Sequence, residues 1–211
     1  MKYSAIVLCA GSGSRTGLGY NKMFYQKDGE TVYQKTMKLF LNDSRCHQII
    51  VVCKQEEMPE FDALVSDKRI KYCIGGKERQ DSVYAGLQVV NQEYVFIHDG
   101  ARPYVARKTM DELCQCVEKH KACLVMVPSI DTLKEVVDGI VVKTPARHTM
   151  MNAQTPQVFE TNLIKEAYQK GKENNFVATD DSSLVEMFTN KKVYVVVGDY
   201  ENKKITTPSD L

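Results

Sequence analysis

Apolar and polar positions along the chain follow two different periods. Continuous apolar runs rich in β-branched residues are typical of strands that are buried on both faces of a parallel sheet. Such runs occur at Ala5–Cys9, Gln48–Cys53, Ile70–Cys73, Tyr94–His98, Cys123–Val127 and Val193–Val197. Between them, apolar residues recur with the period of an amphipathic helix at Val32–Leu41, Ser82–Val90, Lys108–Lys119, Leu163–Lys172 and Asp181–Phe188. The alternation predicts an α/β fold, a Rossmann-like, mostly parallel sheet with helices on both faces.

One segment, residues 131–147, departs from this alternation. Two short β-prone stretches, Leu133–Val137 and Ile140–Val142, flank Asp138-Gly139, and Asp-Gly in this setting is a strong hairpin signal. An isolated hairpin is only marginally stable in water, so we expect it to pack on something, most simply a second copy of the chain. The length of 211 residues suggests a single domain, 1–211, from which this hairpin protrudes as an arm.

Composition excludes several classes of protein. A net charge of +1 gives no footprint for nucleic acid or for an anionic membrane surface. No apolar stretch approaches the roughly 18 residues of a membrane span. Seven cysteines, an odd number, do not resemble a disulfide framework, and the four histidines are scattered. We therefore expect a cytoplasmic protein that acts on small molecules, with no nucleic-acid or membrane partner.

The first predicted strand leads into a glycine-rich loop, CAGSGSRTGLGYNK at residues 9–22. Glycines let backbone N–H groups approach phosphate oxygens, and Arg15 and Lys22 can offset the phosphate charge. The GxxxxGK[ST] pattern of a P-loop is absent, and Thr16 stands where a dinucleotide fingerprint has its third glycine. The loop favours nucleotide phosphates beyond the strand end, where ligands bind in such sheets. A solvated turn explains the loop alone about equally well.

A carboxylate follows the Tyr94–His98 strand. Asp99 could hold Mg²⁺ together with triphosphate oxygens, because Mg²⁺ prefers carboxylates combined with phosphates. The alternative is that Asp99 caps a turn and pairs with Arg102. We expect His98 to bond a backbone carbonyl rather than to act in catalysis.

Two helix starts carry further polar residues. Gly76 and Ser82 could approach the edge of a base, although Asp81 or Ser82 could equally be the N-cap of the following helix. Thr179 precedes two aspartates that open another predicted helix, where a cap is again a sufficient explanation.

In this order the segments resemble one family across nearly the whole chain: the 2-C-methyl-D-erythritol 4-phosphate cytidylyltransferases of the non-mevalonate isoprenoid pathway. The matching stretches are AGSGSR (10–15), NKMF (21–24), GGKERQDS (75–82), HDGARP (98–103), DTLK (131–134), QTPQ (154–157), TDDSSLVE (179–186) and NKKITTPSDL (202–211). The resemblance implies a nucleotidyltransferase that uses Mg²⁺, transfers CMP from CTP to 2-C-methyl-D-erythritol 4-phosphate and releases pyrophosphate. It also implies a homodimer in which the hairpin arm reaches the site of the partner subunit.

The same resemblance implies roles for individual residues. The catalytic residues would be Arg15, Lys22 and Lys204, which hold the triphosphate and offset charge on the α-phosphate. The nucleotide-binding residues would be Ala10, Gly11, Gly13, Gly76, Arg79, Ser82, Asp99 and Ala101, with Asp99 also binding the metal. The acceptor-binding residues would be Thr132, Arg147, Thr179, Arg102 and Thr155, with Thr132 and Arg147 supplied by the arm.

Some positions depart from the family pattern. Asn21 stands where a proline is often found, so we expect Lys22 to be presented less rigidly. Met23 stands where a glutamine is common. Lys203 occupies a position that is often apolar, which leaves open whether Lys203 or Lys204 faces the site. Relatives usually continue past the position of Leu211 into a terminal helix, and we expect a chain without it to be less stable.

Three other functions compete with this interpretation. A ribitol 5-phosphate cytidylyltransferase of teichoic acid synthesis shares the fold and the CTP site, but Lys134 and the helix start at Thr179 favour the methylerythritol enzyme. A catalytically silent nucleotide-binding module would be expected to lack at least one of Arg15, Lys22, Asp99 and Lys204. A dinucleotide-dependent oxidoreductase is disfavoured by Thr16.

Overall fold

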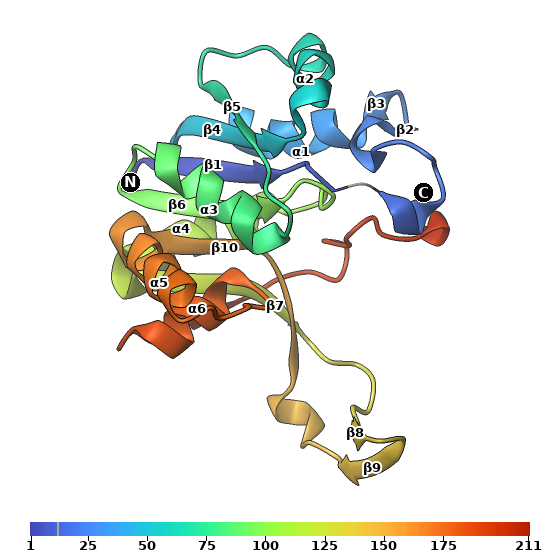
Figure 1. Cartoon of the computed structure of the whole chain (residues 1–211), viewed down its shortest axis with the longest axis vertical. Coiled ribbons are helices and arrows are strands. Elements are labelled where there is room, and N and C mark those ends of the chain that lie inside the picture. Colours follow the sequence, from blue (N-terminus) through green and yellow to red (C-terminus); the bar gives the residue numbers. More distant parts are fainter. Residues whose placement is uncertain (12) are drawn as a thin grey trace.

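The structure, a computed structural model, describes residues 1–11 and 13–211 and is built on a seven-stranded sheet (Figure 1). Its strands, in the spatial order β11-β7-β10-β6-β1-β4-β5, are β1 (Tyr3–Leu8), β4 (Cys46–Cys53), β5 (Ile70–Ile74), β6 (Tyr94–Asp99), β7 (Ala122–Pro128), β10 (Met151–Glu160) and β11 (Tyr194–Val197). Neighbouring strands are parallel except around β10, which is antiparallel to both β6 and β7. The sheet is therefore mostly parallel.

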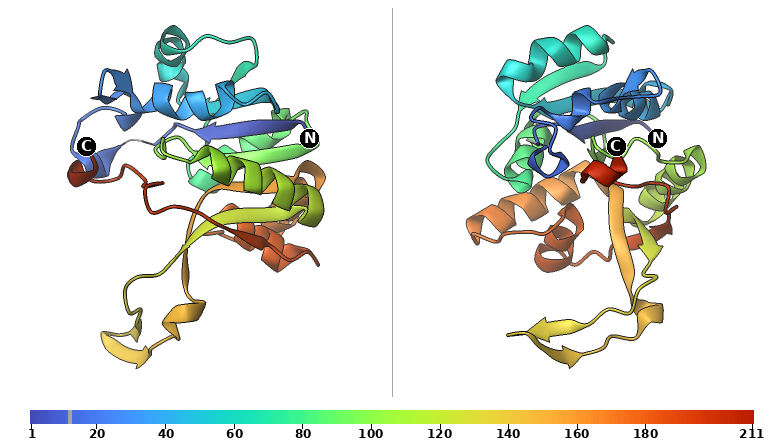
Figure 2. Two further views of the ribbon diagram at one scale, coloured as in Figure 1. Left: turned by 180° about the vertical axis from the view of Figure 1, so that it is seen from behind. Right: turned by 90° about the vertical axis from the view of Figure 1, so that its right-hand side faces the viewer.

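Helices cover both faces of this sheet (Figure 2). One face carries α1 (Val32–Leu41), α2 (Met58–Leu64) and α4 (Arg107–His120), and the other carries α3 (Arg79–Val89), α5 (Thr161–Glu173) and α6 (Asp181–Phe188). Successive side chains of a strand point to opposite faces. In β1, Ala5 and Val7 pack into the first core whereas Ile6 packs into the second. Burial on both faces explains the continuous apolar runs, and the predicted α/β architecture is confirmed.

The starts of helices follow local capping chemistry. α1 begins at Val32, as predicted, because Thr31 accepts a hydrogen bond from the Gln34 N–H while the Gln34 side chain accepts one from the Thr31 N–H. α3 begins three residues earlier than predicted. Its N-cap is Glu78, so the expectation that Asp81 or Ser82 caps this helix is wrong.

Strand β10 was not predicted from the sequence. Polar residues and Pro156 interrupt its apolar pattern, and such a stretch is typical of a loop. The ladder with β7 shifts register between Ala153 and Gln157, so the proline lies at an irregularity where a missing N–H is tolerated. The polar side chain of Gln157 is buried, and its amide is satisfied there because it accepts from the Ser182 N–H and donates to Asp180. Tertiary hydrogen bonds therefore replace the apolar signal that identifies the other strands.

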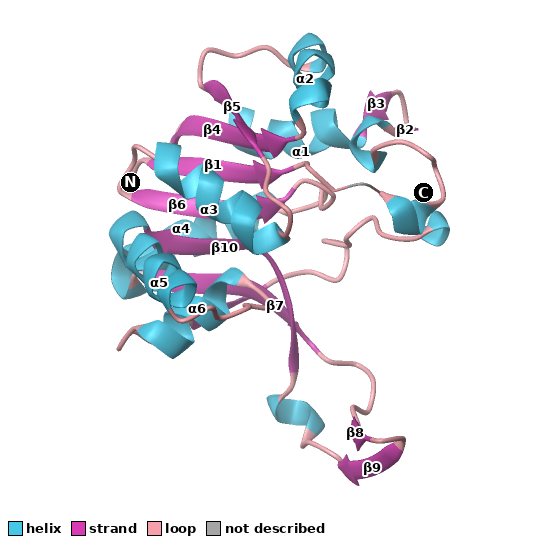
Figure 3. Cartoon of the chain, in the orientation of Figure 1, coloured by secondary structure: helices cyan, strands magenta, loops and turns pink. Residues whose placement is uncertain are grey.

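Two small hairpins lie outside the main sheet (Figure 3). β2 (Gln26–Lys27) pairs with β3 (Glu30–Thr31), and β8 (Glu135–Val137) pairs with β9 (Ile140–Lys143). The β8–β9 turn contains Asp138 and Gly139, both at positive φ, as an Asp-Gly hairpin requires. This hairpin projects from the body of the molecule in Figure 1, and residues 131–144 are exposed.

Two further properties of the described residues concern the cysteines and the helices. All seven cysteines are free thiols. Among residues 1–11 and 13–211, no helix is long and apolar enough to span a bilayer.

Candidate active site

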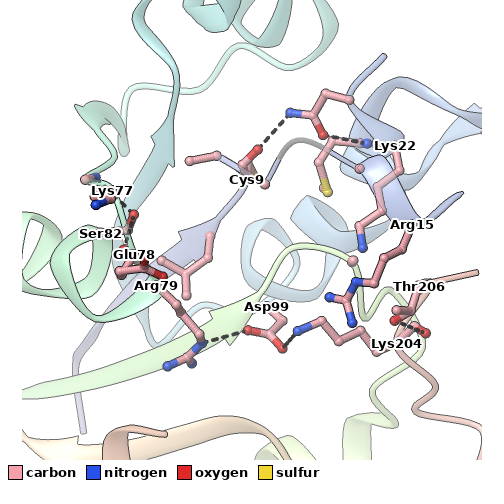
Figure 4. A pocket seen from close by; sticks show the side chains of 18 residues that line it. Cys9, Arg15, Lys22, Lys77, Glu78, Arg79, Ser82, Asp99, Lys204 and Thr206 are labelled. Carbon is pink, nitrogen blue, oxygen red and sulfur yellow. Dashed lines mark hydrogen bonds and ion pairs between the residues drawn. The ribbon is translucent and has the colours of Figure 1, made fainter. Parts of the chain in front are cut away.

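A cleft of about 360 Å³ opens at the carboxyl ends of β1 and β6, where the glycine-rich loop and α3 begin (Figure 4). Predicted site residues line it together with several neighbours: Leu8, Cys9, Ala10, Gly11, Gly13, Arg15, Asn21, Lys22, Met23, Gly76, Lys77, Glu78, Arg79, Ser82, Asp99, Ala101, Lys204 and Thr206. All the residues predicted to be catalytic or nucleotide-binding are therefore brought together, although they come from four distant stretches of the chain.

The glycine loop turns back on itself beside the cleft. Ser12 lies outside the described residues. Gly13 has a φ of +67°, and a Cβ there would lie 3.0 Å from the Tyr20 carbonyl oxygen and 3.2 Å from the Lys22 nitrogen. Thr16 closes the turn by donating from Oγ1 to the Gly13 carbonyl at 2.6 Å. Glycine at position 13 thus lets the loop pack directly against the backbone that carries Lys22.

Lys22 is held inside the cleft. It begins a short 3-10 helix, Lys22–Phe24, and its Nζ donates to the carbonyl oxygen of Ile205 at 2.6 Å. Burial lowers the pKa of Lys22, and repulsion from Lys204 and Arg15 lowers it further. Figure 4 shows these three cationic side chains converging on one part of the cleft. A site in which cations repel one another is suited to bind a polyanion.

Asp99, at the end of β6, is the carboxylate at the centre of this cluster. Its side chain lies 2.8 Å from Lys204 Nζ, 3.3 Å from Arg79 Nε and 3.8 Å from Arg102 Nε. Burial alone would raise the pKa of Asp99, but the Arg79 and Lys204 cations outweigh it and hold that pKa well below its usual value. Asp99 is therefore ionised at neutral pH.

Lys203 and Lys204, which follow the last strand, have different surroundings. Lys204 faces the cleft and contacts Asp99, whereas the side chain of Lys203 is 65% exposed and lies 4.0 Å from Glu201. The N–H of Ile205 donates to the Ala101 carbonyl at 2.9 Å, which attaches this segment to the HDGARP loop. The alternative that Lys203 faces the site does not agree with this arrangement.

Arg79 is anchored by residues that sequence reasoning did not single out. Its two terminal nitrogens lie 3.0 and 2.8 Å from the carboxylate oxygens of Asp181, which is completely buried and also accepts from the Tyr168 hydroxyl. Asp180 is the N-cap of α6, which agrees with the expected capping role of this aspartate pair. Only the second aspartate of the pair is an ion-pair partner, and the sequence offers no signal that distinguishes the two.

The turn before α3 packs against the glycine loop. A Cβ at Gly75 would lie 2.7 Å from the Ala10 Cβ, so only glycine permits this approach. Ser82 is buried; its hydroxyl accepts from the Gly76 N–H at 3.1 Å and donates to the Glu78 carbonyl at 3.2 Å. Ser82 thereby shapes the Gly76 turn where it lines the cleft.

His98 and Thr155 support Asp99 from beneath. The Thr155 hydroxyl accepts from the Asp99 N–H and donates to His98 Nδ1, because the other ring nitrogen, Nε2, must carry a proton to donate to the Arg102 carbonyl. Burial lowers the pKa of His98 to about 4. The expectation that His98 bonds a backbone carbonyl is confirmed. Thr155, predicted to bind the acceptor, is buried and its hydroxyl is engaged by Asp99 and His98.

The remaining residues predicted to bind the acceptor do not line the cleft of their own chain. Arg102 is partly buried and donates from Nη1 to the Asn202 carbonyl at 2.7 Å. Thr179 is exposed just before α6. Thr132 and Arg147 lie on the projecting hairpin segment, where Arg147 Nη1 donates to the Ile130 carbonyl.

The donor set of the cleft is compatible with a magnesium ion held jointly with a substrate. Within residues 1–11 and 13–211 there is no group of three or more His, Cys, Asp or Glu side chains able to hold a metal by themselves. Mg²⁺ usually takes only one or two protein carboxylates and completes its shell with phosphates and water. Asp99, an ionised carboxylate beside a cationic phosphate-type loop, fits that requirement.

Comparison with known proteins shows which family this chain resembles. The family described as 2-C-methyl-D-erythritol 4-phosphate cytidylyltransferase matches residues 3–211. A relative of that name from Bacillus mycoides is 44% identical, over 99% of this chain and 94% of the relative, and one from Clostridioides difficile is 43% identical, over 99% and 90%. A crystal structure of 4-diphosphocytidyl-2C-methyl-D-erythritol synthase from Anaerococcus prevotii has a TM-score of 0.88 at 34% identity, and covers 99% of this chain and 92% of that one.

Proposed function

Because the chain belongs to the 2-C-methyl-D-erythritol 4-phosphate cytidylyltransferase family, we propose that the cleft at the carboxyl ends of β1 and β6 is where its reaction takes place. The protein is a nucleotidyltransferase that transfers the cytidylyl group of CTP to 2-C-methyl-D-erythritol 4-phosphate in isoprenoid synthesis. The alternative acceptor, ribitol 5-phosphate, is not favoured.

The reaction needs positioning and charge stabilisation. A phosphate oxygen of the acceptor attacks the α-phosphorus of CTP, a new O–P bond forms, and the bond to the β-phosphate oxygen breaks to release pyrophosphate. Arg15, Lys22 and Lys204 offset the negative charge that builds up on the α-phosphate and on the leaving group. The observation that carries this assignment is the convergence of these three cations on one part of the cleft, where Lys204 Nζ lies 2.8 Å from the Asp99 carboxylate.

Asp99 is the residue we assign to magnesium. When bound with CTP, the ion supplies additional charge neutralisation at the phosphates. The chain's own contribution is to keep Asp99 ionised and in place, through Arg79 and through the Thr155 hydroxyl on its backbone N–H.

We assign the base to the turn before α3. Gly76 presents backbone with no side chain in the way, and Ser82 holds that turn in shape. We assign the triphosphate to the glycine loop, with Ala10, Gly11 and Gly13, and Ala101 lines the same cleft.

We assign the acceptor to both subunits of a homodimer. Thr179 and Arg102 belong to the same chain as the cations, whereas Thr132 and Arg147 reach in from the arm of the partner. Apolar residues of the arm support a second copy as its partner, because a monomer would leave them in water: Leu133, Val136, Val137, Ile140, Val141 and Val142 are all exposed. We also propose a reducing, cytoplasmic location, which the free thiols support.

Mixing two impaired variants at an acceptor concentration below the KM of Arg147→Ala tests the shared site. Lys22→Ala removes a cation that we assign to the cleft, and we expect kcat to fall by roughly 10²–10³. Arg147→Ala damages only the arm. If sites are shared, mixed dimers of the two variants contain one site with both residues intact and recover activity. Absence of recovery after subunit exchange has been demonstrated would remove the arm from the site.

A further inference from the structure

Asn21, the residue before Lys22, is buried and uses its whole side-chain amide. Its Nδ2 donates to the Cys9 carbonyl at 2.8 Å and to Glu57 Oε2 at 2.9 Å, and its Oδ1 accepts from the Met23 N–H at 3.1 Å. The bond at Cys9 is drawn as a dashed line in Figure 4. The residue before Lys22 is therefore held on three sides by hydrogen bonds.

The partners of Asn21 fix the orientation of its amide. A backbone carbonyl and a carboxylate only accept hydrogen bonds, and a backbone N–H only donates. A flipped amide would place its oxygen against both acceptors and its nitrogen against the donor of Met23. The hydrogen-bond pattern therefore admits one orientation.

The three hydrogen bonds connect segments whose relative positions matter for the proposed reaction. Cys9 directly follows β1 and begins the glycine loop, and Glu57 lies in the short 3-10 helix Gln55–Glu57 that follows β4. The same turn places the Lys22 nitrogen 3.2 Å from a Cβ built at Gly13. The side-chain amide of Asn21 thus connects the start of the glycine loop, the segment that follows β4 and the turn that carries Lys22.

We infer that Asn21 is a positioning residue that sets the place of Lys22 relative to the phosphates. The inference rests on the proposed role of Lys22. Asn21 need not touch the substrate: it acts because the Cys9 carbonyl and the Glu57 carboxylate hold the backbone from which Lys22 extends. A misplacement of about 1 Å in a charged group can cost roughly 10² in rate. Positioning of this kind lowers kcat and leaves the KM of the acceptor unchanged.

Asn21→Asp tests the role with almost no change of shape. The substituted side chain still accepts from the Met23 N–H, but it presents a second oxygen to the Cys9 carbonyl and to Glu57. We expect kcat to fall about 10- to 100-fold, with the acceptor KM changed by less than about threefold. Glu57→Gln is the matched control, because its amide oxygen still accepts from Asn21, and its kcat should stay within about twofold of the parent.

The double variant Asn21→Asp/Glu57→Gln provides a rescue. The amide nitrogen of the substituted residue 57 can donate to the carboxylate at position 21, so kcat should recover at least about fivefold over Asn21→Asp alone. A purely structural role would lower the melting temperature of the Asn21 variant and leave kcat near the parent, and that result overturns the inference. Equal kcat in the single and double variants also overturns it.

Two further variants keep the outcomes separable. Asn21→Ala adds no charge and replaces Asn21→Asp if the latter does not fold; we expect a kcat loss of about tenfold, and a kcat within twofold of the parent contradicts positioning. Lys22→Ala reports on the proposed function itself. Full activity of Lys22→Ala would show that the role of Lys22 is wrong, whereas loss of activity there with normal Asn21 variants would show that only the positioning role is wrong.

Discussion

The pair Lys203 and Lys204 offers a sharp test because adjacent, chemically identical side chains have opposite surroundings. Lys204 Nζ lies 2.8 Å from the Asp99 carboxylate in the cleft, and Lys203 extends into solvent, 4.0 Å from Glu201. Lys→Met keeps most of the length and apolar surface of the side chain and removes the charge. The Lys203→Met variant is therefore a matched control for Lys204→Met.

The structure sets different magnitudes for the two changes. Removing a preorganised group that stabilises developing charge costs roughly 10²–10³ in kcat, or about 2.7–4 kcal/mol. We expect that loss for Lys204→Met. The exposed ion pair of Lys203 with Glu201, at 4.0 Å, contributes only about 0–1 kcal/mol to the free energy of unfolding. Because Lys203 extends into solvent, Lys203→Met should keep kcat within about twofold of the parent. The free energy of unfolding should fall by only about 1–2 kcal/mol in Lys204→Met, since Arg79 still faces Asp99.

The assay is pyrophosphate release with saturating CTP, Mg²⁺ and 2-C-methyl-D-erythritol 4-phosphate, with urea unfolding of each variant in parallel. Lys204→Arg, which retains the charge, should recover part of kcat. The reasoning is refuted if Lys204→Met retains kcat within tenfold of the parent while folded. It is equally refuted if Lys203→Met loses as much activity as Lys204→Met.

Other outcomes follow from the arm, the buried histidine and the pKa of Lys22. Arg147→Ala should raise the KM of the acceptor far more than that of CTP in steady-state kinetics, and the reverse pattern would contradict the arm assignment. The pKa of His98 is lowered to about 4 by burial, so the unfolded chain binds a proton that the folded chain does not between pH 6.5 and 4. The free energy of unfolding should therefore fall by about 3 kcal/mol as pH drops through that window; His98→Asn should flatten this dependence in urea titrations, and an unchanged slope would exclude His98 as its source. Because burial and neighbouring cations lower the pKa of Lys22, kcat/KM should decline at a pH below the usual lysine range. Lys22→Arg should lack that decline. If the parent and Lys22→Arg lose kcat/KM at the same alkaline pH, the decline belongs to another group.

Hydrophobic periodicity and capping residues predicted the strands and helices that depend on neighbouring residues in the sequence. β1 and β6 are continuous apolar runs because both of their faces are buried, and α1 carries its own capping signal at Thr31. β10 could not be predicted in this way. Its central residues are polar and include Pro156, and their burial depends on hydrogen bonds to the start of α6.

The site shows the same division. The cations of the glycine loop and Asp99 follow strand ends, where a parallel sheet places ligand-binding groups, so their convergence could be predicted. The supports of these residues could not. Asn21 meets Glu57 across 36 positions, and Arg79 meets Asp181 across 102, contacts for which the sequence carries no periodic or capping signal. Asp180 and Asp181 are identical in type, and only packing buries the second.

The most direct test of the whole account is pyrophosphate release from CTP and Mg²⁺ with each of three additions: 2-C-methyl-D-erythritol 4-phosphate, ribitol 5-phosphate, or no acceptor. We predict release with the first addition alone, and mass spectrometry should find the product as acceptor plus one cytidylyl group, that is, CMP less one water. Release with ribitol 5-phosphate alone would contradict the acceptor assignment. A folded protein that binds CTP and releases no pyrophosphate with either acceptor would contradict the account of this cleft as an active site.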